Sequence, residues 1–355
     1  MKITKNQIAS DLKSLGLKEG SHVAVSLSLK SIGFVEGGPD AFIDAVLDVI
    51  SPEGTLMMNT YTRLFPLSDI DPQYVFDPET TIPWTGIVPS TLMKRKNAIR
   101  SRHPACSVVA LGKHARFLTE GHDEHVENEY LPYVKLAQTN GHYLCIGIND
   151  NFVAIRHEAQ RRAGLFVVPK FTGVMYKNRQ GETKPFILRN AICSVTQPLL
   201  VPQLVEMGIV KRGKIGMASS TLSPASELIE AMTSLLSEDP TLNLCSNAFC
   251  LECRELERRL NLYDRIRNPG FFQRNIAARK LIELRNKIVL RRYACVRVSN
   301  SKQNGKPNLS LFAERGIPNL VGSISRILGK SGTNGGKEQT NSSNELSQDA
   351  IGSRT

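Results

Sequence analysis

His157 lies in a segment, residues 151–163, whose pattern predicts a helix. Imidazole has an ordinary pKa of about 6.5, so it can accept a proton near neutral pH. On a helix, Val153 and Gln160 share a face with this histidine, at i−4 and i+3. Glu158 points elsewhere, because one step along a helix turns about 100°. The spacing predicts a general base held by an amide, although a lone helical histidine also fits a structural role.

The stretch at 26–40 carries hydroxyl and glycine residues between a predicted strand and a predicted helix, and reads S-L-S-L-K-S-I-G-F-V-E-G-G-P-D. Backbone N–H groups freed at glycines and at a helix start suit an anion such as phosphate. Lys30 adds a positive charge. The stretch is neither a Walker A motif nor a dinucleotide-binding fingerprint. A glycine-rich turn without a ligand is therefore the favoured alternative from this stretch alone.

Two further segments hold polar side chains beside prolines, at 76–81 and at 100–107. In the first, Asp77 precedes a proline, and its carboxylate can either form an Asx turn or face a cationic ligand. In the second, His103 precedes a proline and can either cap a strand or contact a substrate. Ser107 ends this segment with a hydroxyl.

Apolar runs alternate with helical patterns, which predicts βα units. Strands are expected at 23–25, 55–58, 107–111, 143–148 and 215–218. Pro39 suits the first position of a helix that ends near Ile50. Ser223 and Pro224 form a predicted N-cap and N1 pair for a helix ending near Leu236. Further elements expected are a helix at the N-terminus, and a hairpin of residues 171–176 and 184–188 around Gly181.

In this order, the segments resemble the aminoglycoside 3-N-acetyltransferase family over about residues 15–255. The resemblance rests on L-G-L-K-E-G at 15–20, the glycine run at 31–41, F-D-P-x-T-T at 76–81, R-S-x-H-P-x-x-S at 100–107, the spacing of ten from Gly147 to His157, E-D-P at 238–240, and the cysteines at 245–253. It implies an α/β acyltransferase fold with a mixed sheet of that family's type. It also implies transfer of an acetyl group from acetyl-coenzyme A (acetyl-CoA) to an amine of an aminoglycoside or related amino sugar.

The resemblance also implies roles for single residues. His157 becomes the general base with Gln160 beside it, and Asp77 and His103 become substrate-facing residues. The cofactor site, with a hydroxyl near the thioester at its end, maps onto Ser28, Lys30, Ser31, Ile32, Gly33, Phe34, Val35, Gly37, Gly38 and Ser107.

Four positions depart from the family's usual residues. Val153 and Ala154 stand where Asn and Thr are common, Gln160 replaces a glutamate, and Cys106 replaces a second histidine. Three functions therefore stay open. They are acetylation of an aminoglycoside, acylation of a cellular carbohydrate precursor, and a non-catalytic relative that acts as a binding protein.

The net charge of +12 lies almost wholly near the end of the chain. Residues 1–250 hold 25 Lys and Arg against 24 Asp and Glu, whereas residues 251–355 hold 20 against 9. Aminoglycosides are polycations that prefer acidic sites, so the nearly neutral first part leaves the acceptor open. Apolar stripes ringed by arginine predict a basic helical extension at 256–330, followed by a disordered polar tail at 331–355. A second copy of the chain or an anionic membrane surface is a candidate partner, and nucleic acid is not expected because aromatic residues are few there.

With 355 residues, 41% of them hydrophobic, and a mean hydropathy of −0.19, the composition is typical of a globular protein. We expect an N-acetyltransferase domain at 1–255. No apolar run approaches the length of a membrane span, and the first residues show no apolar leader, so a cytoplasmic location is expected.

Seven cysteines are an odd, sparse set, which suits a reducing compartment. Cys245, Cys250 and Cys253 have C-x4-C-x2-C spacing, which also opens a plant-type iron–sulfur pattern and fits zinc. A fourth ligand would have to be Cys295. The resemblance supplies no metal role for these residues, so we expect reduced thiols and no metal.

Overall fold

The computed structural model describes residues 2–125, 129–148, 152–165, 172–188, 193, 199–245, 250, 253, 255, 256 and 258. All of them fall within one compact unit, Met1–Ile276. The predicted polar tail, Cys295 and the predicted basic extension beyond Arg258 lie outside the described residues. Among the helices of the described part, none is long and apolar enough to cross a bilayer.

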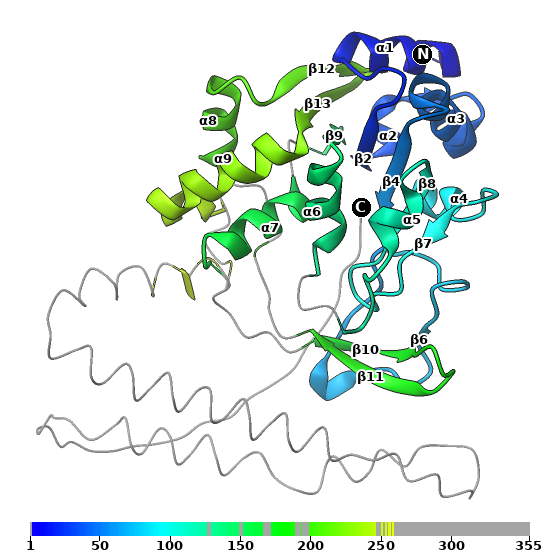
Figure 1. The fold of residues 1–355 in the computed structure, drawn as a ribbon, viewed down its shortest axis with the longest axis vertical. Helices are drawn as coiled ribbons and strands as arrows, with labels where there is room; N and C mark the ends of the chain where they lie inside the picture. The colour runs from blue at the N-terminus through cyan, green and yellow to red at the C-terminus, as the bar shows by residue number, and fades with distance from the viewer. Residues whose placement is uncertain are drawn as a thin grey trace, which may run out of the picture. The chain divides into compact units, whose positions relative to one another are not determined.

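A seven-stranded mixed sheet organises these residues (Figure 1). In spatial order its strands are β12 (Lys211–Ile215), β13 (Ala218–Pro224), β9 (His142–Ile146), β2 (His22–Leu27), β4 (Thr55–Asn59), β8 (Val108–Gly112) and β7 (Ile99–Arg100). The three central strands, β9, β2 and β4, run parallel, and the pairs on either side are antiparallel. The mixed sheet confirms the predicted fold class.

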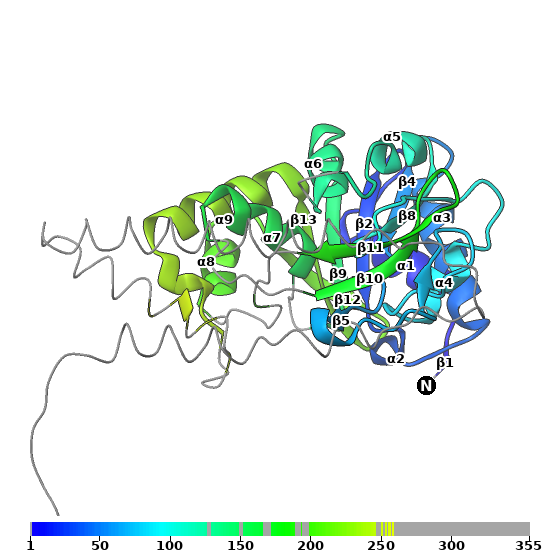
Figure 2. The same cartoon turned by 90° about the horizontal axis from the view of Figure 1, so that it is seen from below.

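Helices cover both faces of this sheet, so its central strands are apolar on both sides. In β2, Val23 and Val25 point into one core cluster and Ala24 into the other. The first cluster lies under α1 (Lys5–Leu15), α2 (Leu29–Ile32), α3 (Gly38–Ile50) and α4 (Ile87–Leu92). The second lies under α5 (Ala115–Thr119), α6 (Leu131–Gln138), α7 (Val153–Arg162), α8 (Leu200–Glu206) and α9 (Ala225–Glu238). Figure 2 shows α1 and α2 on one side of the sheet and α5 and α6 on the other.

Several predicted elements agree closely with the structure. The expected strands at 23–25 and 55–58 lie within β2 and β4, and 107–111 overlaps β8. The helix expected from Pro39 is α3, which begins one residue earlier. Its N-cap residue, Gly37, has a φ of 81°, a left-handed conformation that suits glycine.

The prediction for residues 215–218 was wrong, because they hold the turn between β12 and β13 rather than a strand. Gly216 has a φ of 56°, and a Cβ there would lie 2.6 Å from the carbonyl oxygen of Ile32. Ser223 and Pro224 were also misassigned, since both still pair with β9. The helix α9 therefore starts at Ala225, one residue after the predicted N1 position.

A smaller sheet lies beside the main one and contains the predicted hairpin, β10 (Thr172–Lys177) and β11 (Thr183–Leu188). Two short strands that the sequence did not predict, β5 (Phe65–Pro66) and β6 (Val75–Phe76), pair with β10. A further unpredicted pair joins β1 (Lys2–Ile3) to β3 (Phe34–Val35). Two-residue strands carry no readable periodicity, because partners distant in sequence define them.

The described core includes Leu256, only 2% exposed, which packs in the cluster under α9. A truncation that tests the basic extension should therefore begin after Arg258. Residues 259–355 hold 18 Lys and Arg against 6 Asp and Glu.

Deleting residues 259–355 should leave a folded protein and abolish binding to anionic vesicles. The reason is that salt-screened attraction to anionic lipid depends on the charge that this deletion removes. Thermal unfolding and vesicle cosedimentation at low and high salt measure the two effects, with neutral vesicles as the control. A truncated chain that does not fold, or that still binds anionic vesicles, would contradict the predicted role.

Candidate active site

One edge of the seven-stranded sheet gathers the residues predicted to do chemistry. Because β2, β4 and β9 run parallel, their last residues, Leu27, Asn59 and Ile146, lie at the same edge. Ser107 joins them there, since the next residue, Val108, pairs with Asn59. The chain leaves β2 toward the helices of one face and leaves β9 toward those of the other. In open α/β sheets, ligands bind at such a switch point.

The backbone of the 28–38 segment is held on two sides. The Ser28 N–H donates to the carbonyl oxygen of Ile146 at the end of β9 (2.9 Å). The carbonyl oxygen of Ile32 accepts a hydrogen bond from the N–H of Met217, in the β12–β13 turn (3.0 Å). The segment is therefore an ordered part of the sheet edge, with one helical turn (α2) inside it.

Ser31 locks this segment onto the residue that follows β9. Its Oγ donates a hydrogen bond shared between Ser28 Oγ (2.9 Å) and the carbonyl oxygen of Gly147 (3.2 Å). Gly147 has a φ of 65°, and a Cβ there would lie 2.3 Å from Ser31 Cβ. Only glycine allows this approach, which also explains why β9 ends at Ile146, two residues earlier than predicted.

The predicted cofactor residues divide into anchors and an outer surface. Ile32 and Val35 are buried in the core, whereas Lys30 is exposed and Phe34 is 67% exposed. At Gly38 an added Cβ would meet no atom within 4 Å. Gly38, in the first turn of α3, thus has open space beside it, as a ligand would need.

The imidazole of His157 is buried and held in one tautomer. Its Nδ1 lies 2.6 Å from Gln160 Oε1, as the i, i+3 spacing predicts. An amide oxygen only accepts hydrogen bonds, so Nδ1 carries the proton and Nε2 keeps its lone pair. Gln160 in turn donates from Nε2 to Asn243 Oδ1, which fixes its orientation.

The surroundings of His157 keep its ring neutral. Burial, and secondly the charge of Arg156, lower the pKa of His157 to about 3, although the bond to Gln160 opposes this. The Glu158 carboxylate is paired with Arg161 (2.9 Å) and Arg162 (2.7 Å). Burial opposes its ionisation, but these hydrogen bonds prevail and lower the pKa of Glu158.

A cluster of buried and partly buried tyrosines, which the sequence analysis missed, lies between the sheet edge and α7. The ring of Tyr130 is 5.2 Å from that of His157, and the rings of Tyr133 and Tyr143 are 5.7 Å apart. Burial raises the pKa of all three phenols and of Tyr61, so they stay protonated. The i, i+3 pair at 130 and 133 was the available sequence signal.

Two of these tyrosines are tied to the parallel strands. The hydroxyl of Tyr133 donates to Asn59 Oδ1 at the end of β4, and that of Tyr143 lies 2.8 Å from Ser26 Oγ on β2. The cluster thus connects the ends of β2 and β4 to the helix that carries His157.

The family model described as aminoglycoside 3-N-acetyltransferase matches residues 25–237, more than half of the chain. This chain belongs to the aminoglycoside 3-N-acetyltransferase family. The resemblance inferred from the sequence is thereby confirmed.

Curated relatives carry the same family name. Aminoglycoside N(3)-acetyltransferase VIII of Streptomyces fradiae is 32% identical over 178 residues, which cover 45% of this chain and 62% of that protein. Aminoglycoside N(3)-acetyltransferase VII of Streptomyces paromomycinus is 27% identical over 259 residues, covering 64% of this chain and 89% of that protein. The first match therefore spans less than two thirds of the relative's own length.

Solved structures of the family share this fold. The aminoglycoside acetyltransferase AAC(3)-Xa is 27% identical, with a TM-score of 0.57, covering 67% of this chain and 93% of its own. AAC-IIIb, in a binary complex with CoASH, is 23% identical with a TM-score of 0.59, covering 70% of this chain and 100% of its own. A mutant of AAC(3)-IVa in complex with a gentamicin is 23% identical with a TM-score of 0.62, covering 73% of this chain and 98% of its own.

In this member of the aminoglycoside 3-N-acetyltransferase family, Ser107 lies fully buried in a hydrogen-bond network. Its Oγ donates to the carbonyl oxygen of Thr60 (2.7 Å) and accepts from Arg100 Nε (3.2 Å). Burial lowers the pKa of Arg100 to about 10, so the guanidinium is still charged at neutral pH. The only hydroxyl proton of Ser107 is donated in the hydrogen bond to the Thr60 carbonyl oxygen. A role of Ser107 near the thioester stays a prediction.

His103 caps the turn that precedes β8. Its Nδ1 accepts from the backbone N–H groups of Ala105 (3.2 Å) and Cys106 (3.0 Å), and its ring stacks 4.7 Å from that of His122. Burial lowers the pKa of His103 to about 3. The capping alternative is thus realised in the structure, and the substrate contact stays a prediction.

Asp77 forms the Asx turn that the sequence left open. Its Oδ1 accepts from the N–H of Glu79 (2.9 Å), and its Oδ2 lies 3.7 Å from Lys177 Nζ. The carboxylate therefore already has a cationic neighbour, and contact with an amino sugar stays a prediction.

Two of the departures from the family pattern place uncharged side chains in the interior. Ala154 is fully buried in the core under α9. Cys106 is buried, and burial with the nearby Glu129 carboxyl raises the pKa of its thiol, so it remains uncharged. The side chain of Val153 lies outside the described residues.

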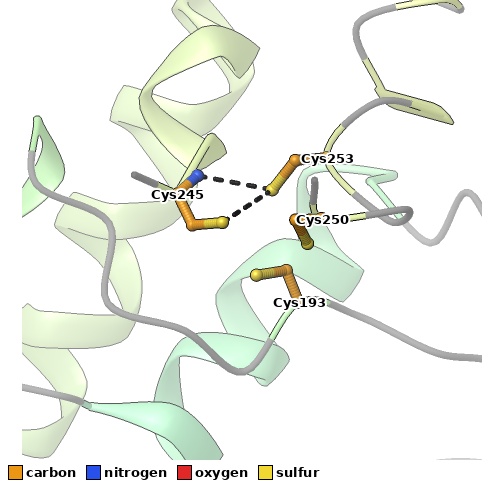
Figure 3. Close-up of side chains that lie close together, drawn as sticks. All are labelled: Cys193, Cys245, Cys250 and Cys253. Atoms are coloured by element: carbon orange, nitrogen blue, oxygen red, sulfur yellow. Dashed lines mark hydrogen bonds between the residues drawn. The ribbon is translucent and has the colours of Figure 1, made fainter. Parts of the chain in front are cut away.

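Four cysteines converge elsewhere in the chain (Figure 3). The Sγ atoms of Cys193, Cys245, Cys250 and Cys253 all lie within 4.8 Å of one another. The expectation that a fourth ligand would have to be Cys295 was wrong, because Cys193 occupies that position. The sequence hid this partner, since it lies 52 residues before Cys245.

The buried histidines predict a loss of stability in acid. In the unfolded chain each ring takes up a proton near its ordinary pKa of about 6.5, but in the native state His157 and His103 do so only near pH 3. Stability should therefore fall as the pH drops from 6.5 toward 3, by up to about 1.4 kcal/mol per pH unit for each ring. Urea unfolding at several pH values between about 5 and 7 measures the slope of the unfolding free energy against pH.

The variant His157→Gln cannot take up this proton when it unfolds. The slope of its unfolding free energy against pH should therefore be shallower, by the equivalent of about one bound proton. The matched control is His125→Gln, because the His125 side chain is 83% exposed. An unchanged slope in His157→Gln would show that the His157 ring is accessible to protons in the native state.

Proposed function

We propose that this protein transfers an acetyl group from acetyl-CoA to an amine of an aminoglycoside or related amino sugar, with His157 as the general base. The observation that carries the proposal is the fixed imidazole: Nδ1–H is held by Gln160, and Nε2 keeps a lone pair. Family membership and the relatives' complexes with CoASH and with a gentamicin support the substrates. Reduced thiols of the kind expected here persist in the cytoplasm, where we place the reaction.

The proposed reaction is a direct acyl transfer. The amine nitrogen attacks the thioester carbonyl carbon, an amide C–N bond forms, and the C–S bond breaks. The proton lost by the amine goes to His157 Nε2, and the imidazolium then gives a proton to the departing thiolate, which restores the neutral ring. Because Nδ1 stays bonded to Gln160, the ring that forms is an imidazolium oriented by an amide.

The missing carboxylate limits this base. A carboxylate beside a catalytic histidine stabilises the imidazolium that forms, whereas the amide of Gln160 brings no net charge. The low pKa keeps His157 neutral, and so able to accept a proton, but it makes the ring a weak base. We therefore expect a modest turnover rate.

We assign the cofactor phosphates and pantetheine to the 28–38 segment. The first N–H groups of a helix have no partner within it, and α3 is long enough, at 13 residues, to present a substantial dipole. The open space at Gly38 and the exposed ammonium of Lys30 lie where an anion could reach these groups.

The second candidate acceptor is a cellular carbohydrate precursor. It is favoured by the Asp77–Lys177 pair, which reduces the attraction for a polycation, and by the near neutrality of residues 1–250. A panel of aminoglycosides and simple amino sugars, assayed by thiol release from acetyl-CoA, separates the two. If none of these amines causes thiol release from acetyl-CoA, the third alternative, a non-catalytic binding protein, is favoured.

Substitution in the 28–38 segment should weaken coenzyme A binding. Gly37→Val places a β-branched residue at a φ of 81°, with its Cβ 3.0 Å from Ala41 Cβ, and Lys30→Glu reverses the nearby charge. We expect a loss of at least about tenfold in affinity, equal to about 1.4 kcal/mol, by calorimetry.

Matched controls separate this loss from strain and from net charge. Gly181→Val has a similar φ of 78° in the β10–β11 hairpin, and Lys18→Glu makes the same charge change before β2, at the opposite edge of the sheet. Equal affinities across all four variants would remove the segment from the cofactor site.

Removing the base should affect turnover rather than binding. His157→Ala should keep its coenzyme A affinity and lose about 10²–10⁴ in kcat, the usual contribution of a general base. Gln160→Glu should raise kcat and move the acid limb of the pH profile upward, since an anion favours imidazolium. Asn243 can rotate its amide to donate to the new carboxylate.

The control is Gln160→Ala, which removes the hydrogen bond without adding charge and should lower kcat. Stopped-flow or steady-state assays across pH distinguish these outcomes. A kcat that does not respond to either His157→Ala or Gln160→Glu would show that the histidine is structural.

A further inference from the structure

Four cysteine side chains from three separate parts of the chain converge on one point (Figure 3). Cys193 lies far upstream, Cys245 follows the short helix at Pro240–Asn243, and Cys250 and Cys253 come just after. Cys193, Cys250 and Cys253 are buried and Cys245 is partly exposed. All four Sγ atoms lie within 4.8 Å of one another.

The spacing of the sulfur atoms fits a single tetrahedral ion. A Zn–S bond of about 2.3 Å in a tetrahedron puts the sulfurs about 3.8 Å apart, so the observed group needs only a small contraction. In a two-iron cluster the ligands divide between two metal ions, which requires sulfurs of different pairs to lie farther apart. Cys245 and Cys253, at 3.5 Å between sulfurs, are also well beyond the disulfide bond length of about 2.05 Å.

We propose that Cys193, Cys245, Cys250 and Cys253 bind one zinc ion in a structural site. Four thiolates complete the tetrahedron and leave no open position for water or substrate, which is typical of structural rather than catalytic zinc. The C-x2-C pair at 250 and 253 has the ligand spacing found in such sites. The proposal is independent of the acetyl transfer proposed above.

Groups around the cluster suit a negatively charged centre. Four thiolates and Zn²⁺ carry a net charge of −2, and the N–H of Cys245 donates to Cys253 Sγ (3.3 Å). Such second-layer hydrogen bonds orient metal ligands. The guanidinium of Arg156, 2% exposed, donates from Nη2 to the carbonyl oxygen of Cys193 (3.0 Å) and brings a positive charge beside the site.

Zinc would join parts of the chain that are distant in sequence. It links Cys193 to the segment that follows Asn243, and the Arg156 hydrogen bond connects this centre to α7. The energy of binding a structural metal contributes to folding, because the unfolded chain has no formed site. Loss of zinc should therefore lower the melting temperature.

Metal analysis of the full-length chain tests the proposal. Protein purified without chelators or metal-affinity resin should contain about one zinc per chain by plasma mass spectrometry. Cys193→Ser and Cys250→Ser should each lose most of it, whereas Cys145→Ser should keep it. Cys145 is a matched control, because it is buried in β9 but lies outside the cluster.

A measurement on the unchanged chain keeps the test decisive even where a variant does not fold. A thiol-specific mercurial should release the zinc to a coloured chelator, and the melting temperature should fall. It should recover once an excess of a small dithiol has removed the mercurial and zinc has been restored. Replacement by Co²⁺ should give the thiolate charge-transfer and visible bands of a tetrahedral site. Folded protein that lacks zinc after growth with added zinc, or that holds iron or paired disulfides at these cysteines, would overturn the proposal.

Discussion

The contact between Ser31 and Gly147 is the constraint on which the candidate site depends. It requires that β2 and β9 be parallel neighbours, so that the segment after one strand rests on the residue after the other. It also requires glycine, since any Cβ would overlap Ser31. The proposed cofactor segment and the chain leading to His157 therefore share one fixed point, and neither can shift without the other. Acyl transfer between two substrates needs such a common reference, because the reacting atoms must meet within a narrow range of positions.

The chain from His157 through Gln160 to Asn243 shows how the interior holds a histidine without a carboxylate. Every link is a hydrogen bond between neutral groups, so the burial of the ring carries no cost for a charge. The consequence is a low proton affinity, which the neighbouring Arg156 lowers further. A carboxylate at position 160 would be buried as well, but the same arginine charge would help to stabilise it. The arrangement of a general base is therefore preserved around His157. The amide of Gln160, in place of a carboxylate, changes the proton affinity of the ring and not its position.

Local patterns in the sequence predicted the elements that local physics decides. Apolar runs identified β2, β4 and β8, and helical spacing placed Gln160 beside His157. The wrong or missing predictions concern segments whose conformation depends on partners distant in the sequence. Residues 215–218 became a turn because β13 pairs with β9 on one side and β12 on the other, and a glycine fits beneath Ile32. The tyrosine cluster was missed for the same reason. Apart from the i, i+3 pair at the start of α6, its members come from separate elements, with Tyr61 after β4 and Tyr143 in β9.

Cys193 illustrates this limit most clearly and joins the two sites. Ligand spacing along the chain pointed forward to Cys295, whereas the fold brings in a residue from upstream. The cation beside it, Arg156, also precedes His157, so one buried charge lies between the cysteine cluster and the proposed base. Neutral thiols bring no charge to that cation, whereas a zinc tetrathiolate would place two negative charges near it. Electrostatic attraction in the interior thus favours a metal at the cluster for a reason separate from the distances between its sulfur atoms.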